Sequence, residues 1–134
     1  MIVGIGCDIV QISRFAKGRD FLFRFMEKHF TGKEIKELEK KKNIQDLDIL
    51  TQSVATRFSA KEAVGKALGT GFRDGIILKD IEIMHDELGK PIVNLHNKAL
   101  FKCQDIAKNK QYHIHITISN EKEYTNAVAI IECA

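Results

Sequence analysis

The strand patterns are clearest near the two ends of the chain: a mostly apolar run at the start and an alternation of apolar and polar residues near the end. The first segment, IVGIGCDIVQI (2–12), is β-branched and mostly apolar, as in a buried strand whose glycines allow close backbone approach. Near the other end Ile114, Ile116 and Ile118 alternate with polar residues in HIHITIS, and NAVAIIE follows the turn-like NEKEYT. The pattern predicts an N-terminal strand and a C-terminal hairpin.

Helical spacing predominates between these strands. A helix is expected after Ser13, with a break at Gly18. Thr31 and Glu34 form a capping box at the start of a second helix, which carries charges on most faces and is expected to be solvated. A polar connection at 43–48 then leads to a longer helix.

The longer helix is expected roughly from Leu50 to Leu68, with alanines that permit tight packing. A loop, TGFRDG, precedes short strands at about 77–84 and 92–96, which the turn DELGKP joins, and a further helix begins near Asn97. This order of elements predicts an α+β fold with a mostly antiparallel sheet packed with helices. Without a linker or repeat, residues 1–134 are expected to form a single domain.

Composition narrows the class of protein. The hydrophobic fraction of 44% and the charged fraction of 29% are ordinary for a globular protein, and a net charge of +3 does not predict nucleic-acid binding. No apolar run is long enough for a membrane span, and no signal-peptide pattern begins the chain. Cys7, Cys103 and Cys133 show neither metal-ligand nor disulfide spacing, so a reducing cytoplasm is expected.

The stretch FSAKEAVGKALGTG (58–71) raises the question of phosphate binding, but two familiar motifs fail. A phosphate-binding loop would need Gly where Ala60 stands and a hydroxyl residue directly after Lys66. The dinucleotide-binding pattern would need a third glycine where Asp74 stands, and a preceding strand rather than a helix. Both interpretations are therefore rejected.

Two carboxylates are the strongest candidates for chemistry. Glu62 and Lys66 have the i, i+4 spacing of an ordinary surface ion pair, but the surrounding residues are small, and Arg57 and Lys61 add further positive charge. Asp8 lies in an apolar strand, where it would either cap a turn or require a partner for its charge. Two carboxylates beside several cations suit Mg²⁺ and a phosphate ligand.

Other polar residues carry weaker signals. The five histidines are isolated or alternate beside apolar residues, so structural or surface roles are favoured for all of them, and Cys103 is expected to lie in the core. Arg14 and Arg24 interleave with phenylalanines, which makes either a solvated face or a basic-rimmed apolar surface that suits an acidic amphipathic helix.

Taken together, GIGCDIV, RFSAKEAVGKALGTG, DELGKP and ISNEKEYTNAVAIIE resemble the small bacterial branch of the 4′-phosphopantetheinyl transferases, the holo-(acyl-carrier-protein) synthases. The resemblance covers nearly the whole chain, with the motifs in the same order. It implies the fold of that family and a Mg²⁺-dependent transfer of 4′-phosphopantetheine from coenzyme A to a serine of apo-acyl carrier protein. The other product is adenosine 3′,5′-bisphosphate, and the pathway is fatty acid biosynthesis.

The resemblance also implies site residues by position. Asp8 and Glu62 match the metal carboxylates, Lys66 matches a lysine near the pyrophosphate, and Arg57, with Lys61 beside it, matches a basic position near the phosphates of coenzyme A. The coenzyme A site is further expected to be lined by Gly69, Thr70, Gly71, Gly89, Lys90 and Pro91. Arg14 and Arg24 match positions that dock the acidic helix of the carrier protein. Family members are typically homotrimers with each site between neighbouring subunits.

One position departs from the family pattern. Many relatives have His where this chain has Asn120, so the proton acceptor is left open between Glu62 and a metal-bound water. Two rival functions use the same residues differently. A Mg²⁺-dependent phosphohydrolase would cleave coenzyme A without carrier protein, and a non-catalytic basic module would bind an acidic protein without needing the carboxylates.

Overall fold

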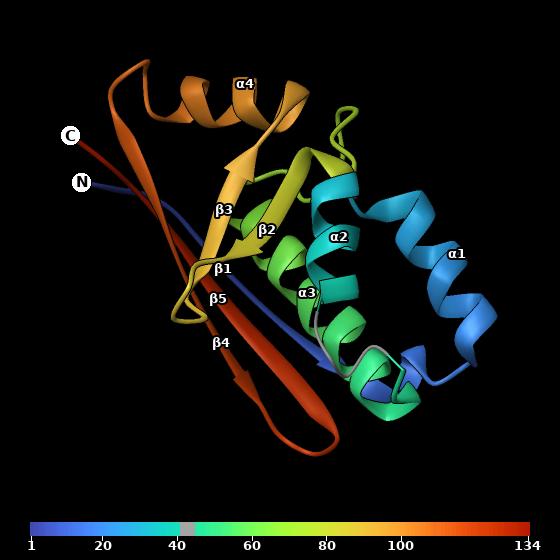
Figure 1. The fold of residues 1–134 in the computed structure, drawn as a ribbon. Helices are drawn as coiled ribbons and strands as arrows, with labels where there is room; N and C mark the ends of the chain where they lie inside the picture. Colours follow the sequence, from blue (N-terminus) through green and yellow to red (C-terminus); the bar gives the residue numbers. More distant parts are fainter. Residues whose placement is uncertain (41–44) are drawn as a thin grey trace.

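The computed structural model describes residues 1–40 and 45–134, and it is an α+β fold, as expected (Figure 1). The elements in chain order are β1 (Ile2–Gln11), a 3₁₀ turn (Ile12–Phe15), α1 (Arg19–His29), α2 (Gly32–Lys40), α3 (Leu47–Ala67), a 3₁₀ turn (Leu78–Asp80), β2 (Ile81–His85), β3 (Pro91–Leu95), α4 (Asn97–Ile106), β4 (Tyr112–Asn120) and β5 (Tyr124–Cys133). None of the described helices has the length and apolar run that a bilayer span requires.

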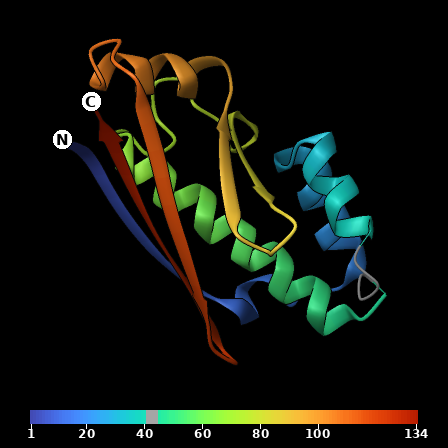
Figure 2. The same cartoon turned by 60° about the vertical axis from the view of Figure 1, so that its left-hand side comes forward.

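The strands form two antiparallel sheets. The larger sheet has the order β1-β5-β4, with Cys7 opposite Val128 and Val128 opposite Thr117, and β2 pairs with β3 in a hairpin. α3 runs along one face of the larger sheet, and among the described helices none lies over the other face (Figure 2). Ile5 and Ile9 of β1 are exposed there, at 64% and 63%.

Contact between β1 and α3 is close because β1 carries glycines. A β-carbon at Gly4 would lie 2.0 Å from the carbonyl oxygen of Ala67, and one at Gly6 would lie 1.9 Å from that of Ala63. No real side chain tolerates such distances to a backbone atom. The alternation of glycine along GIG therefore lets the strand rest directly on the helix backbone.

The buried apolar residues form two cores. One includes Ala60, Ala63 and Val64 of α3 with Ala127, Ala129 and Ile131 of β5. The second lies where α1 and α2 pack on the first half of α3. Its centre is formed by Leu22, Met26, Phe30, Leu38, Leu50 and Val54, all of them buried. The break expected at Gly18 is present, since Gly18 has a φ of 93° and α1 starts directly after it. The capping box is also confirmed: Thr31 N donates to Glu34 Oε1, and Glu34 N donates to Thr31 Oγ.

Three sequence expectations are wrong in detail. α2 is not solvated on all sides, because Glu34 and Leu38 are buried. α3 begins at Leu47 rather than near Leu50, since the side chain of Asp46 caps it; residues 43 and 44 of the expected connection lie outside the described residues. The strand expected from residue 77 begins at Ile81, after a 3₁₀ turn.

The β1–α3 contact leads to a first prediction. Gly6→Ala should lower the free energy of unfolding by about 1–3 kcal/mol or more, because the new methyl group meets a backbone oxygen that cannot move aside. Urea denaturation followed by circular dichroism measures the change. Gly32→Ala is the matched control: Gly32 lies in α2 with open space around it, so stability should stay the same or rise by up to about 1 kcal/mol. Equal effects at both positions would contradict the close contact.

Candidate active site

The first group of polar residues lies where β1 meets the second half of α3. Lys66 Nζ donates to Asp8 Oδ1 at 3.1 Å and to the carbonyl oxygen of Cys7 at 2.9 Å. The other carboxylate oxygen, Asp8 Oδ2, is buried and lacks a hydrogen-bond partner, and it is the one such side-chain atom among the residues described. A buried carboxylate oxygen without a partner is costly unless a ligand completes it.

Glu62 lies on α3 within the electrostatic reach of Asp8. Burial and the negative charge of Asp8 raise the pKa of Glu62 above its ordinary value, against the opposing effects of Lys66 and Arg14. Lys66 forms its ion pair with Asp8, so the Glu62–Lys66 surface pair considered from spacing is not the observed contact. Two neighbouring negative charges repel each other, and a cation bound beside both carboxylates would offset that repulsion.

These two carboxylates fit Mg²⁺ better than a metal that needs a full set of protein ligands. No group of three or more His, Cys, Asp or Glu side chains in the described part of the chain could hold a metal ion. Mg²⁺ is commonly held by one or two carboxylates, with phosphate and water completing its coordination. The unpaired oxygen of Asp8 is the atom that would coordinate such an ion.

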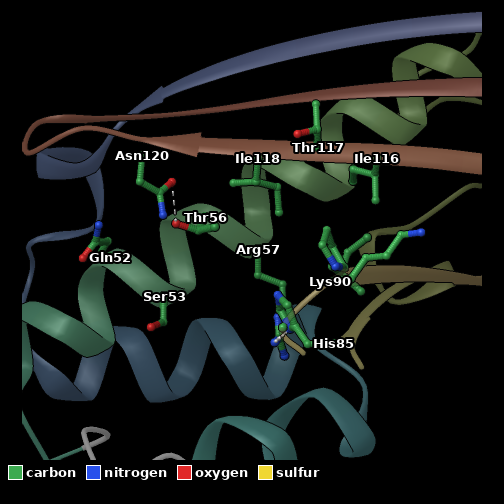
Figure 3. A pocket seen from close by; sticks show the side chains of 13 residues that line it. Gln52, Ser53, Thr56, Arg57, His85, Lys90, Ile116, Thr117, Ile118 and Asn120 are labelled. Atoms are coloured by element: carbon green, nitrogen blue, oxygen red, sulfur yellow. Dashed lines mark hydrogen bonds between the residues drawn. The ribbon is translucent and has the colours of Figure 1, made fainter. Parts of the chain in front are cut away.

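The second group lines a cavity of about 510 Å³ on the other side of α3 (Figure 3). α3 supplies Gln52, Ser53, Thr56 and Arg57; β2 and its turn into β3 supply Ile83, His85, Gly89, Lys90 and Pro91; and β4 supplies Ile116, Thr117, Ile118 and Asn120. Gly89 has a φ of 86° in this turn, a conformation that favours glycine. Arg57, Gly89, Lys90 and Pro91 are thus brought together, as the sequence predicts.

Arg57 is fixed from behind and is only 2% exposed. Its guanidinium donates to the carbonyl oxygen of Glu34 at 3.0 Å and to Glu37 Oε1 at 2.8 Å. These contacts come from α2, which holds the arginine against α3. Arg57 therefore shows little surface to the cavity, and Glu37 pairs with its charge.

The placement of Lys61 contradicts its expected contact with coenzyme A. Its side chain is fully buried, and Nζ donates to Glu34 Oε1 at 2.7 Å and to the carbonyl oxygens of Leu78 and Ile81. An ammonium group has three N–H donors, and all three are used. Burial lowers the pKa of Lys61, against the raising effect of Glu34. The role of this lysine is structural.

The remaining predicted residues are dispersed. Gly69, Thr70 and Gly71 follow the C-terminus of α3, about one helical turn beyond Lys66, and both glycines have positive φ. Asn120 lines the cavity, where its Oδ1 accepts from Thr125 Oγ at 2.5 Å. Cys103 lies in the core as expected, and burial raises the pKa of its thiol to about 11.

Among the cavity residues that the sequence analysis did not predict, His85 is the one it assigned to a different role. All five histidines were expected to be structural or surface residues, yet His85 lines the cavity beside Arg57 and Lys90. His85 directly precedes the DELGKP turn, part of which the sequence analysis assigned to the coenzyme A site, and this neighbourhood could have indicated a place for His85 in the same cavity.

Arg14 lines a separate hollow, and its charge reaches Glu62. This hollow holds about 300 Å³ and is lined by Arg14, Phe15, Lys17, Phe21, Phe25 and Phe58. Lys17 Nζ lies 5.2 Å from the centre of the Phe21 ring. Arg24 is exposed on α1 and does not line this hollow. The arrangement is an aromatic depression with basic residues at its rim.

Residues 4–128 match the family model of the 4′-phosphopantetheinyl transferase superfamily. The chain belongs to that superfamily. It is 43% identical to a holo-(acyl-carrier-protein) synthase of Clostridium tetani over 132 residues, which cover 98% of this chain and 97% of the relative. Its fold is similar to an acyl carrier protein synthase of Plasmodium yoelii with ADP bound, at a TM-score of 0.85 and 33% identity, covering 100% of this chain and 97% of that one.

A second similar structure was solved with a ligand bound. It is a holo-(acyl-carrier-protein) synthase of Bacillus anthracis in complex with coenzyme A (3′,5′-ADP), with a TM-score of 0.76 and 34% identity, covering 100% of this chain and 99% of that one. The fold of this transferase chain is therefore shared with structures that bind the expected donor.

The raised pKa of Glu62 gives a second prediction. Between pH 4.5 and the raised pKa, the folded chain keeps a proton that the unfolded chain has released, so the free energy of unfolding falls as pH rises through this interval. In metal-free protein at pH 7, Glu62→Gln should therefore raise the melting temperature. The difference should vanish below pH 4.5, where both forms are neutral.

Differential scanning fluorimetry with EDTA from about pH 4 to about pH 8 measures this effect, since the range starts just below the ordinary glutamate pKa of 4.5 and extends above it. Glu39→Gln, on an exposed position of α2, is the matched control and should change nothing. A lower melting temperature for Glu62→Gln at pH 7 would show that Lys66 and Arg14 outweigh burial and the charge of Asp8.

Proposed function

We propose that this chain is a holo-(acyl-carrier-protein) synthase that uses Mg²⁺ and acts in fatty acid biosynthesis. It transfers 4′-phosphopantetheine from coenzyme A to a serine of apo-acyl carrier protein and releases adenosine 3′,5′-bisphosphate. Full-length relatives with that name support the reaction. The structural observation that carries the proposal is the unpaired buried oxygen of Asp8 beside Glu62 and Lys66. The cytoplasmic location expected from three free cysteines stays a prediction.

In the proposed reaction, the serine oxygen bonds to the phosphorus that carries pantetheine, and the bond from that phosphorus to the bridging oxygen of the pyrophosphate breaks. Mg²⁺ held by Asp8 and Glu62 would neutralise negative charge on the pyrophosphate. Lys66 adds a positive charge beside Asp8, where negative charge grows on the leaving bisphosphate. The serine proton would pass to Glu62, the carboxylate that α3 supplies at this site.

The carrier protein is expected to dock at the aromatic depression of Arg14, Phe15, Lys17, Phe21, Phe25 and Phe58. An amphipathic acidic helix complements it, because apolar side chains would fill the depression while carboxylates meet the basic rim. Arg24, exposed on α1, would extend the basic surface. The charge of Arg14 lowers the pKa of Glu62, so the rim of the depression lies within electrostatic reach of the carboxylates.

A homotrimer would bring the two polar groups together. In one chain, Asp8 lies on β1 and Asn120 on β4, at opposite edges of the larger sheet. The pyrophosphate is expected at the carboxylates, whereas the remaining phosphate of coenzyme A suits the cavity with Arg57 and Lys90. A head-to-tail ring places the β1 edge of one subunit beside the β4 edge of the next. The exposed apolar face with Ile5 and Ile9 gives this ring a surface to bury.

The proposed reaction is tested by intact-mass spectrometry of apo-acyl carrier protein incubated with coenzyme A, Mg²⁺ and the protein. We expect a mass increase of one phosphopantetheine on the carrier, which EDTA abolishes. Asp8→Ala should reduce the rate by about 10²–10³-fold, since the metal site loses one of its two carboxylates. Coenzyme A cleaved without carrier modification would instead indicate a phosphohydrolase, and binding without any reaction would indicate a non-catalytic module.

The shared site is tested by mixing two inactive variants. Asp8→Asn removes the metal carboxylate, and Lys90→Glu reverses a charge at the rim of the cavity, where the side chain is exposed. Each variant alone should be nearly inactive, and refolding them together at equal amounts should restore about a quarter of the wild-type activity, the fraction of head-to-tail sites with two intact halves. Activity of the mixture no greater than the sum of its parts would show that one chain builds the whole site.

A further inference from the structure

Glu37 of α2 holds two nitrogen-bearing side chains of the cavity, Arg57 and His85, at once. Its Oε1 lies 2.8 Å from a guanidinium nitrogen of Arg57 and 2.5 Å from His85 Nδ1, and its Oε2 accepts from the backbone N–H of His85 at 3.1 Å. Burial alone would raise the pKa of Glu37, but the hydrogen bonds from His85 and the charge of Arg57 lower it below its ordinary value. Glu37 is therefore an ionised acceptor.

This contact fixes which nitrogen of the His85 ring carries the proton. An ionised carboxylate only accepts hydrogen bonds, so at the shorter of its two contacts His85 Nδ1 donates to Glu37. A guanidinium nitrogen of Arg57 lies farther from the same Nδ1, at 3.3 Å. No described residue forms a hydrogen bond with the opposite nitrogen, Nε2, and this atom is not among the buried unpaired atoms of the described chain. The His85 side chain is 24% exposed, and it forms part of the cavity wall (Figure 3).

His85 is also better exposed than the arginine beside it. Arg57 is 2% exposed, and its guanidinium donates hydrogen bonds to Glu34 and Glu37. Among the Arg, Lys and His residues that line the cavity, His85 and Lys90 therefore offer the surface that a ligand can touch. Arg57 lies behind them, paired with Glu37.

We propose that His85 is a substrate-contacting residue that binds the 3′-phosphate of coenzyme A through Nε2, with Glu37 as its positioning residue. This inference rests on the proposed function. The pyrophosphate belongs with Asp8, Glu62 and Lys66 on the other edge of the sheet, so the phosphate left for this cavity is the one on the ribose. In this complex the ring would carry a proton on each nitrogen, and it would donate Nδ1–H to Glu37 and Nε2–H to a phosphate oxygen.

The test compares coenzyme A with dephospho-coenzyme A, which lacks the 3′-phosphate. For His85→Ala we expect the KM for coenzyme A to rise about 10- to 150-fold, the effect of losing a hydrogen bond to a charged group, with kcat unchanged. The KM for dephospho-coenzyme A should not change. His85→Gln keeps a neutral N–H donor and much of the volume, so its KM for coenzyme A should rise less.

His96→Ala is the matched control, because His96 also lies beside a carboxylate, Glu82, but does not line the cavity. It should leave both KM values as in the wild type. An unchanged KM for coenzyme A in His85→Ala would overturn the proposal. Equal increases for the two donors would also overturn it, since they would show a general effect on the cavity.

A binding experiment separates this inference from the proposed function. In ¹⁵N NMR spectra of the full chain, adenosine 3′,5′-bisphosphate should shift the Nε2 resonance of His85, and adenosine 5′-monophosphate should not. If the wild-type protein transfers nothing to a carrier but this shift appears, the reaction is wrong and the phosphate contact stands. If transfer occurs and the shift is absent, the contact is wrong.

Discussion

The close contact between β1 and α3 determines where the carboxylates meet. Gly4 and Gly6 let the strand lie against the carbonyl oxygens of Ala67 and Ala63. Only at that separation does Asp8, two residues beyond Gly6, come within hydrogen-bond distance of Lys66 and within electrostatic reach of Glu62. A larger residue in the strand would move Asp8 away from α3, so the packing of small residues and the chemistry of the site depend on the same backbone approach.

The carboxylate site is destabilised in the protein alone. Asp8 keeps one buried oxygen without a partner, and Glu62 is held near a like charge. Both costs are offset elsewhere: the two apolar cores flank α3, and Asp46 caps its start. A site that is costly when empty binds its cation and phosphate more favourably than a relaxed site would, because the ligand removes the unfavourable terms.

Much of this could be predicted from sequence because the signals are local. Asp8 lies in a short strand motif, Glu62 and Lys66 are one helical turn apart, and the turn at Gly89 is marked by its residues. The errors share a different cause. Lys61 and Glu34 lie 27 residues apart, and His85 and Glu37 lie 48 apart, so nothing near either residue indicates its partner. The buried face of α2 was missed for the same reason, because its charges point to α3 and β2.

The buried ion pair of Glu34 and Lys61 also limits how the sequence can change over time. Glu34 accepts from Thr31 N, Ile83 N and Lys61 Nζ, so it joins α2, β2 and α3 in one hydrogen-bonded cluster. Removing one member of such a pair leaves an uncompensated charge and costs about 3–5 kcal/mol, a large part of the ~5–15 kcal/mol that holds a domain folded. Replacing both together costs far less. Evolution by single steps must therefore pass through an unstable intermediate, and the two positions are expected to persist or disappear as a unit.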